Sequence, residues 1–391
     1  MRKWTWIVVL FSRLILNLGV RVTYPFLPAI ARGLGISFEH AGLLVAARHF
    51  MGLTAAFWGI LSERKGYLRG MLLGLSALLV GALVVSVSRS FSLALIGFML
   101  IGIAKPVYDP SVQAYASERV PYSKRARALG ILESAWAGSW LLGIPLSGIL
   151  IAHFGWQSPF VVIAGAALVA IMCTSQLPDV TRTIPDPSDT SNPTAVRPNG
   201  AASMEGKPFF ILGVSFLMLF ANENMVIVYG AWLEEQFHLQ VQELGLFSML
   251  VGMAELGGEL TVVAVVDRIG KRRAILGGLT LTGLSYLILP FCRGSLFLAF
   301  AGLVWMFYLF EFTVVSVFPY VSELVPSERG KWLAFNFSAL VVGRMAGALS
   351  GPWLWQKNSS LHTLATLSLL AQILAVFLLL WAGTNRQTPH A

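Results

Sequence analysis

Residues 115–121 read Tyr-Ala-Ser-Glu-Arg-Val-Pro, and residues 320–326 read Tyr-Val-Ser-Glu-Leu-Val-Pro, 205 positions later. A second pair of similar segments has nearly the same offset: residues 63–66 read Glu-Arg-Lys-Gly, and residues 267–270 read Asp-Arg-Ile-Gly. Each of these four segments is polar and lies beside a long apolar stretch. An internal repeat of this kind indicates two copies of one structural unit, an arrangement typical of membrane transporters.

The composition indicates a membrane protein. Hydrophobic residues make up 56% of the 391-residue chain and charged residues only 12%, whereas soluble domains contain about 25% charged residues. Apolar segments of about 20 residues, long enough to cross a bilayer, recur along the whole chain. We expect twelve membrane-spanning helices, near residues 4–28, 41–61, 70–88, 91–113, 128–152, 157–177, 208–232, 243–265, 273–292, 295–319, 332–354 and 361–382. The fold class is therefore an all-α membrane protein of two pseudo-symmetric six-helix bundles.

One polar segment divides the chain. Residues 179–207 contain four prolines among Ser, Thr, Asp and Asn, a composition that cannot bury enough apolar surface to order itself. We therefore predict an N-terminal bundle over residues 1–178, a flexible cytoplasmic linker over 179–207, and a C-terminal bundle over 208–391.

The basic residues are unevenly distributed between the two sides of the membrane. The net charge is +9, but a cytoplasmic N-terminus places nineteen of the 28 Lys and Arg residues on the cytoplasmic side and four on the other. This bias follows the positive-inside rule and predicts that both termini are cytoplasmic. The basic excess therefore indicates membrane topology rather than nucleic-acid binding, with membrane lipids as partners. We expect location in the cytoplasmic (inner) membrane.

A loop motif identifies a family. Residues 59–69 read Gly-Ile-Leu-Ser-Glu-Arg-Lys-Gly-Tyr-Leu-Arg, which resembles the signature loop between spans 2 and 3 of the major facilitator superfamily, with Glu63 where Asp is usual. The second copy at Asp267 has Val263 in place of the leading Gly. The run Tyr-Pro-Phe-Leu-Pro at 24–28 is similar to the drug and metabolite:proton antiporter branch. The sequence departs from the pattern of this branch at two places. Residues 144–149 keep only part of the span 5 antiporter signature, and Phe98 occupies the position where the branch has an arginine.

The resemblance implies a role for the loop segments as gates that lock the cytoplasmic side while the site faces outward. An alternative is that their charges only enforce topology. We expect Glu118 and Glu323 to complete these networks with Arg119, Arg125 and Arg329. The residues assigned to the gates and signature loops are Gly59, Glu63, Arg64, Gly66, Arg69, Glu118, Arg119, Asp267, Arg268, Gly270, Arg272, Glu323 and Arg329.

Charged residues inside the predicted spans mark the functional interior, because each costs at least about 2.5–3.5 kcal/mol at the bilayer centre unless it faces a cavity or a partner. The first half contributes mainly cations and the second half mainly acids, so we expect a cationic wall to face an acidic wall across the seam between the halves. The residues assigned to the substrate cavity are Arg13, Asn17, Arg21, Tyr24, Lys105, Asp109, Glu223, Glu311 and Arg344.

Several of these charges have two interpretations. Arg13 and Arg21 either capture an anionic or polar substrate group or form salt bridges across the cavity. Lys105 and Asp109 are one helical turn apart, which favours mutual neutralisation. Glu133 is interpreted as a structural partner, with Arg48 as its cation.

Two carboxylates are predicted to carry protons. Glu255 and Glu259 are four residues apart on span 8 and therefore share a helix face. Two neighbouring carboxylates cannot both ionise cheaply in a low dielectric, so one of them would hold a proton. The alternative is that Arg344 and another cation neutralise the pair.

The sequence predicts a secondary transporter that works by alternating access, and most specifically proton-coupled efflux of a small amphipathic organic compound. The alternatives are uptake or facilitated transport of an organic anion, a lipid-like flippase, and a sensor without transport activity. We expect no enzyme activity, because no phosphate loop or Ser-His-Asp arrangement has credible spacing. We also expect no cofactor, metal or nucleic acid, and a monomer whose partners are its substrate, protons and lipids.

Overall fold

The computed structural model describes residues 3–121, 125–179, 207–325 and 328–384. The predicted linker falls almost entirely on residues 180–206, outside the described residues. The described chain contains twelve helical segments long and apolar enough to span a membrane, which confirms the all-α, twelve-span prediction. The helices of the first half are α1 (Lys3–Arg21), α2 (Thr23–Leu34), α3 (Phe38–Phe50), α4 (Ala55–Lys65), α5 (Tyr67–Ser86), α6 (Phe91–Glu118), α7 (Arg125–Gly138), α8 (Ile144–Phe154) and α9 (Ser158–Ser175). Those of the second half are α10 (Lys207–Val226), α11 (Tyr229–Phe237), α12 (Val241–Ile269), α13 (Lys271–Ile288), α14 (Leu296–Leu324), α15 (Arg329–Asn358) and α16 (Leu361–Thr384).

Several spans are interrupted. The predicted first span is two helices, because α1 ends at Arg21 and α2 begins at Thr23. Pro25 and Pro28 lie in α2, and since proline lacks an N–H, neither can continue the hydrogen-bond ladder from the preceding turn. The fifth span contains a π-helical turn, Ser139–Gly143, immediately before Pro145. Such turns are frequent at functional sites.

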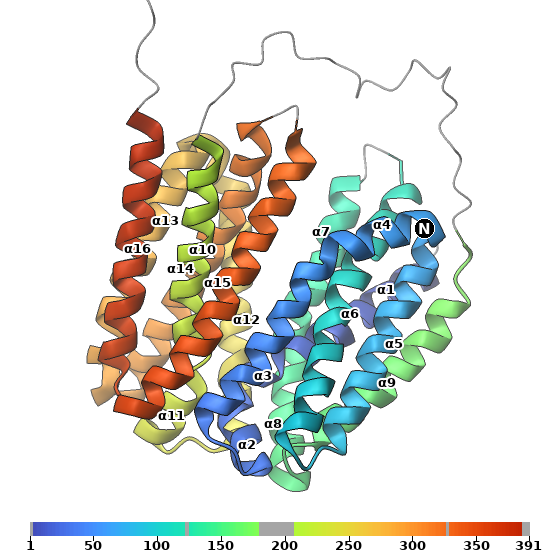
Figure 1. The fold of residues 1–391 in the computed structure, drawn as a ribbon, viewed down its shortest axis with the longest axis horizontal. Coiled ribbons are helices and arrows are strands. Elements are labelled where there is room, and N and C mark those ends of the chain that lie inside the picture. Colours follow the sequence, from blue (N-terminus) through green and yellow to red (C-terminus); the bar gives the residue numbers. More distant parts are fainter. Residues whose placement is uncertain (1–2, 122–124, 180–206, 326–327, 385–391) are drawn as a thin grey trace, which may run out of the picture.

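The two halves stand side by side in Figure 1, the first half (blue to green) on the right and the second (yellow-green to red) on the left. We call the end at which α4 turns into α5, and α12 into α13, the signature-loop face; it is at the top of Figure 1. The other end is the opposite face. Helix α1 begins, and α16 ends, at the signature-loop face.

The halves pack against each other most closely near the opposite face. There α3 packs on α15 and α8 packs on α12. A Cβ at Gly42 would lie 2.6 Å from the Ala348 carbonyl oxygen, and one at Gly148 would lie 2.9 Å from the Val241 carbonyl oxygen. Only glycine allows backbones to approach this closely. The opposite face is therefore closed.

The signature glycines have a clear backbone role. Gly66 and Gly270, at equivalent turns of the two halves, have φ of 100° and 89°. This region is accessible to glycine and strained for other residues. The repeat seen in the sequence therefore reflects the same tight helix-to-helix turn in each half.

Candidate functional site

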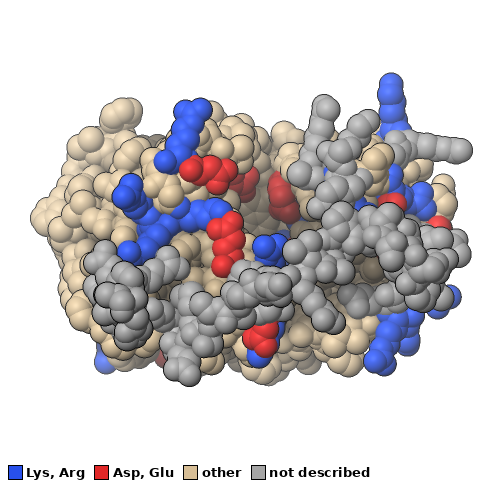
Figure 2. Space-filling view, turned by 90° about the horizontal axis from the view of Figure 1, so that it is seen from above, with Lys and Arg blue, Asp and Glu red and all other residues tan. Residues whose placement is uncertain are grey.

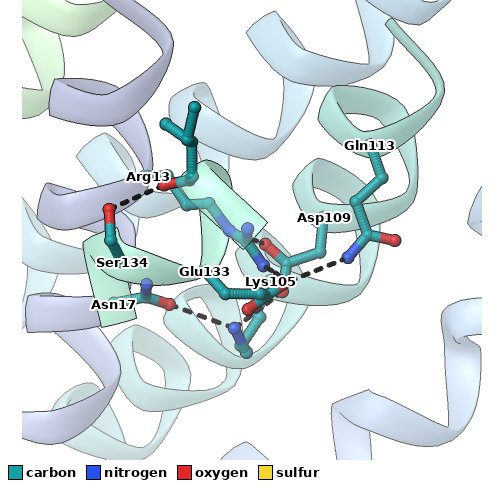
Figure 3. A network of polar contacts seen from close by, with 8 residues as sticks. Arg13, Asn17, Lys105, Asp109, Gln113, Glu133 and Ser134 are labelled. Atoms are coloured by element: carbon teal, nitrogen blue, oxygen red, sulfur yellow. Dashed lines mark hydrogen bonds and ion pairs between the residues drawn. The ribbon is translucent and has the colours of Figure 1, made fainter. Parts of the chain in front are cut away.

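A first polar network lies within the first half, where α1, α6 and α7 meet (Figure 3). Arg13 on α1 is 3% exposed and forms ion pairs with Glu133 of α7 at 2.8 Å and with Asp109 of α6 at 3.5 Å. Lys105 pairs with Asp109 at 2.6 Å and donates a hydrogen bond to Asn17 at 3.0 Å. Two cations and two carboxylates therefore neutralise one another inside one half.

The contacts of this network differ from two predictions, one on the partner of Glu133 and one on the cationic wall. Glu133 was expected to pair with Arg48, which is wrong, because the partner of Glu133 is Arg13. The expected mutual neutralisation of Lys105 and Asp109 is present. Because Arg13 and Lys105 both pair within their own half, the predicted wall of cations facing a wall of acids does not describe these two residues.

A second network joins the two halves. The buried guanidinium of Arg21 forms an ion pair with Glu255 of α12 at 2.7 Å. The indole Nε1 of Trp140, in the π-helical turn, donates to the same carboxylate oxygen at 2.9 Å. The Arg21 guanidinium carbon lies 3.4 Å from the ring centroid of Trp136, and the Lys105 ammonium lies 4.7 Å from the same ring. The Trp136 ring therefore contacts one cation from each network. The quadrupole of the ring attracts both cations.

A third network also crosses the seam. His49 Nε2 of α3 lies 3.2 Å from Glu223 Oε1 of α10 and 3.1 Å from the Tyr24 hydroxyl. The neighbouring Arg48 is buried and donates from Nη1 to the Val20 carbonyl and, at 3.0 Å, to the Thr23 hydroxyl. These are the residues at the break between α1 and α2, so Arg48 stabilises the interrupted backbone there.

Three further charges in the interior have no ionic partner within 4 Å among the described residues. Two are the carboxylates of Glu259 on α12 and Glu311 on α14, and the third is the guanidinium of Arg344 on α15. All three side chains are partly accessible. The two acids lie where α12 and α14 meet closely, since a Cβ at Gly258 would be 3.1 Å from the Glu311 Cβ.

The charged residues expected in the signature loops lie at the signature-loop face, but their partners differ from the expected ones. Glu323 forms an ion pair with Lys271 rather than with Arg329, and Arg119 donates to the Pro178 and Asp179 carbonyl oxygens. Arg272 donates to the Leu379 and Leu380 carbonyl oxygens at 3.2 Å. The side chain of Glu63 lies outside the described residues. The remaining loop charges, Arg64, Arg69, Glu118, Asp267, Arg268 and Arg329, are exposed.

The same face is hollowed between the halves in Figure 2, with Asp and Glu side chains (red) in and beside the hollow. Combined with the close backbone contacts at the opposite face, this arrangement opens the interior toward the signature loops.

Two copies of one family profile account for nearly the whole chain. The profile of the Major Facilitator Superfamily matches residues 9–222 and, a second time, residues 209–391. The chain belongs to the major facilitator superfamily. The first match continues past residue 178 into α10, where the second match begins. Membership makes the chain a secondary transporter rather than an enzyme.

Curated relatives of this superfamily member match over more than nine-tenths of its length. The uncharacterized MFS-type transporter YceJ of Bacillus subtilis (strain 168) is 26% identical over 384 residues, covering 96% of this chain and 95% of that protein. Multidrug resistance protein 2 of the same organism is 21% identical over 366 residues, covering 91% and 90%.

Solved structures share the fold. A D-xylose–proton symporter superposes with a TM-score of 0.76 at 15% identity, covering 96% of each chain. A bacterial homolog of the human lysosomal transporter Spinster, in an inward-facing and occupied conformation, has a TM-score of 0.76 at 14% identity, covering 99% of each chain. At these identities the similarity concerns the fold alone.

Within this superfamily fold, sequence reasoning missed some site residues. Trp136 and Trp140 are not among the site residues predicted from the sequence, yet their indoles contact Arg21 and Glu255. Their spacing of four residues puts them on one helix face, but only the tertiary structure brings Arg21 to that face. His49 is also absent from the predicted site residues, although it lies 3.2 Å from Glu223 across the seam.

Proposed function

We propose that this transporter exports a small amphipathic organic compound in exchange for protons. The observation that carries the proposal is the position of Glu259 and Glu311, two partly accessible carboxylates on adjoining helices with no ionic partner within 4 Å among the described residues. Carboxylates in such a setting either bind protons or bind a cationic group of a substrate. If a proton replaces the substrate at these carboxylates, proton entry is coupled to substrate exit.

Glu255 belongs to the same acidic group but has a different role in this proposal. It is held by Arg21 and Trp140, whereas Glu259, one turn further along α12, is not. A proton therefore binds Glu259 or Glu311 first, and it reaches Glu255 only when the ion pair with Arg21 opens. This makes the Arg21–Glu255 pair the link between proton binding and separation of the halves.

We further propose that the signature-loop face is cytoplasmic and that the structure is the inward-open state. The excess of basic residues at this end supports the orientation, and the loop residues of the two halves would close over the hollow in the outward-open state. The cellular location proposed is the cytoplasmic membrane.

A second function is favoured by one observation. Arg344 is partly accessible and has no carboxylate within 4 Å among the described residues, so it is available to bind an organic anion. Arg13, Arg21 and Lys105 are already paired with acids, which leaves less free positive charge than the sequence suggested. Proton-coupled efflux is therefore the leading proposal.

The test measures internal pH in proteoliposomes containing the full chain while cationic, neutral or anionic compounds are added outside. Substrate-dependent proton movement is expected in the wild type and its loss in Glu259→Gln. The matched control is Glu328→Gln, which removes an exposed carboxylate at the loop face and should leave the signal unchanged. Anion flux without proton movement, abolished in Arg344→Gln and unaffected in Glu259→Gln, would overturn the proposal in favour of the second function.

A further inference from the structure

We propose that a pocket at the turn between α12 and α13 binds the phosphate group of an anionic membrane lipid. The pocket has a volume of about 570 Å³ and is formed by the end of α12, the first turns of α13 and the end of α14. It lies at the signature-loop face of the second half. Neither Glu259 nor Glu311 lines it, so the proposal does not depend on proton coupling.

Positive charge exceeds negative charge in this pocket. Four cations and two carboxylates line it, namely Arg268, Lys271, Arg272, Arg273, Asp267 and Glu323. Glu323 pairs with Lys271, whereas Arg268 and Arg273 have no carboxylate oxygen within 4 Å among the described residues. Figure 2 shows Lys and Arg side chains (blue) gathered over this half, on the left. The charge of the pocket therefore favours an anion as its ligand.

The backbone at the start of α13 adds to this positive charge. The first hydrogen bond of the helix runs from the Ala274 amide to the Gly270 carbonyl oxygen, so the amides of residues 271–273 lie outside the helical ladder. The first turn contains no acidic residue, and no side chain caps it. Instead it carries three consecutive cations, which the positive end of the helix dipole disfavours. A phosphate bound there would remove this repulsion and accept hydrogen bonds from the amides.

The side chain of Arg272 also points to a missing acceptor. Its Nη2 donates to the carbonyl oxygens of Leu379 and Leu380 on α16, and these bonds hold the guanidinium in place. Its Nε is buried and has no hydrogen-bond partner among the described residues. A buried donor without an acceptor is costly, and a phosphate oxygen is an acceptor of the opposite charge.

The equivalent turn of the first half already contains an anion. Gly66 and Arg69 correspond to Gly270 and Arg273 in the repeat. A Cβ at Gly66 would lie 3.9 Å from Oδ1 of Asp179, so a carboxylate that follows α9 lies at the first turn of α5. That turn carries one cation instead of three. By the internal symmetry, the phosphate occupies in the second half the place that the Asp179 carboxylate has in the first.

The apolar part of the pocket favours a lipid over a soluble phosphate. Leu276 and Leu324 line the pocket, and both belong to membrane-spanning segments. A lipid covers these side chains with its glycerol and acyl groups while its phosphate reaches the cations, whereas a free phosphate ion leaves them uncovered. Basic pockets between transmembrane helices are typical binding sites for phospholipid headgroups.

The test measures lipid binding by native mass spectrometry of the full chain, purified in an uncharged detergent and without substrate. The probes are phosphatidylglycerol, phosphatidylcholine with the same acyl chains, and inorganic phosphate. We expect phosphatidylglycerol to bind about tenfold more tightly than phosphatidylcholine, because the choline group cancels the phosphate charge and is repelled by the cations. Inorganic phosphate in excess should not displace the lipid.

Paired variants assign the binding to this pocket. Arg268→Gln combined with Arg273→Gln removes the two unpaired cations and leaves the bonds of Arg272 to α16 intact, and it should lower the affinity for phosphatidylglycerol by about tenfold. Replacing the same two residues by lysine keeps the charges and should restore most of the affinity. The matched control is Arg64→Gln combined with Arg69→Gln, which removes two exposed cations from the equivalent turn and should leave the affinity unchanged.

Three results would overturn the proposal. The first is an unchanged affinity for phosphatidylglycerol in the Arg268→Gln, Arg273→Gln variant. The second is an equal loss in the control variant, which would show general attraction of lipid to a basic surface. The third is displacement of the lipid by inorganic phosphate, which would make the pocket a site for soluble phosphate. Since no proton gradient or substrate is present, none of these results bears on proton-coupled efflux.

Discussion

The ion pair between Arg21 and Glu255 gives the sharpest test of how the halves are held together. Replacing Arg21 by methionine keeps an unbranched side chain of similar length but removes the charge. Glu255 is then left buried at 6% exposure, without a cation beside it, while the Trp140 indole still donates a hydrogen bond to it. Removing one member of a buried ion pair typically costs about 3–5 kcal/mol, because the other charge is left uncompensated.

The magnitude can be separated from simple loss of packing by a double variant. Arg21→Met combined with Glu255→Gln removes both charges, so no uncompensated carboxylate remains, and we expect at least about half of the lost stability to return. The unfolding free energy of wild type, both single variants and the double variant is measured by chemical denaturation in detergent micelles. The single Arg21→Met variant should also be less impaired at acidic pH, where a proton on Glu255 removes its charge.

The reasoning would be refuted by either of two results. The first is an Arg21→Met variant within about 0.5 kcal/mol of the wild type, which is the effect expected of a surface substitution. The second is a double variant whose destabilisation equals the sum of the two single variants, because additive effects indicate that the residues do not interact.

Three further predictions concern other contacts of the site and the seam. Asp109→Asn should destabilise the protein more than Glu133→Gln, because Asp109 contacts two cations while the Glu133 side chain is 47% exposed. The two variants are compared by thermal unfolding in detergent, and an equal loss of thermal stability would contradict this ranking of the contacts. Gly148→Val should cost about 1–3 kcal/mol by forcing α8 away from α12 and should shift spin-label distances at the opposite face toward the open state; an unchanged distance distribution would show that this contact does not hold the face closed. Arg32→Ala should change the unfolding free energy by less than about 1 kcal/mol, since its ion pair with Glu234 at 2.8 Å joins side chains that are 59% and 27% exposed; a loss above about 2 kcal/mol would show that this exposed pair is a main closing contact.

The sequence predicted the architecture well because its signals are local. Apolar run length fixes the number of spans, since each span must satisfy its own backbone hydrogen bonds in lipid. The repeated Ser-Glu-x-Val-Pro and the repeated loop glycines at 66 and 270 marked two equivalent halves, and the positive φ of both glycines explains why the residue recurs. The same logic could not place the break at Val22, where the effect of two nearby prolines depends on whether other side chains stabilise the freed carbonyls.

The candidate site was predicted only as a set of residues. Counting charges in the spans identified nearly all of the members, because an ionisable group in a membrane helix is rarely tolerated without a function or a partner. It did not identify the pairs. Glu133 was expected to neutralise Arg48, yet it contacts Arg13, because the partner depends on which faces of α1, α6 and α7 meet.

The sequence by itself determined that this chain is a twelve-span transporter of two related halves, because hydrophobic length, charge bias and local turn chemistry are properties of contiguous segments. Only the tertiary structure decided which charges neutralise one another and which are left over. Arg21 and Glu255 are 234 residues apart in sequence and 2.7 Å apart in space, and no periodicity connects them. The energy of an ion pair depends on the distance between its charges, so the pairing follows from how the helices of the two halves pack.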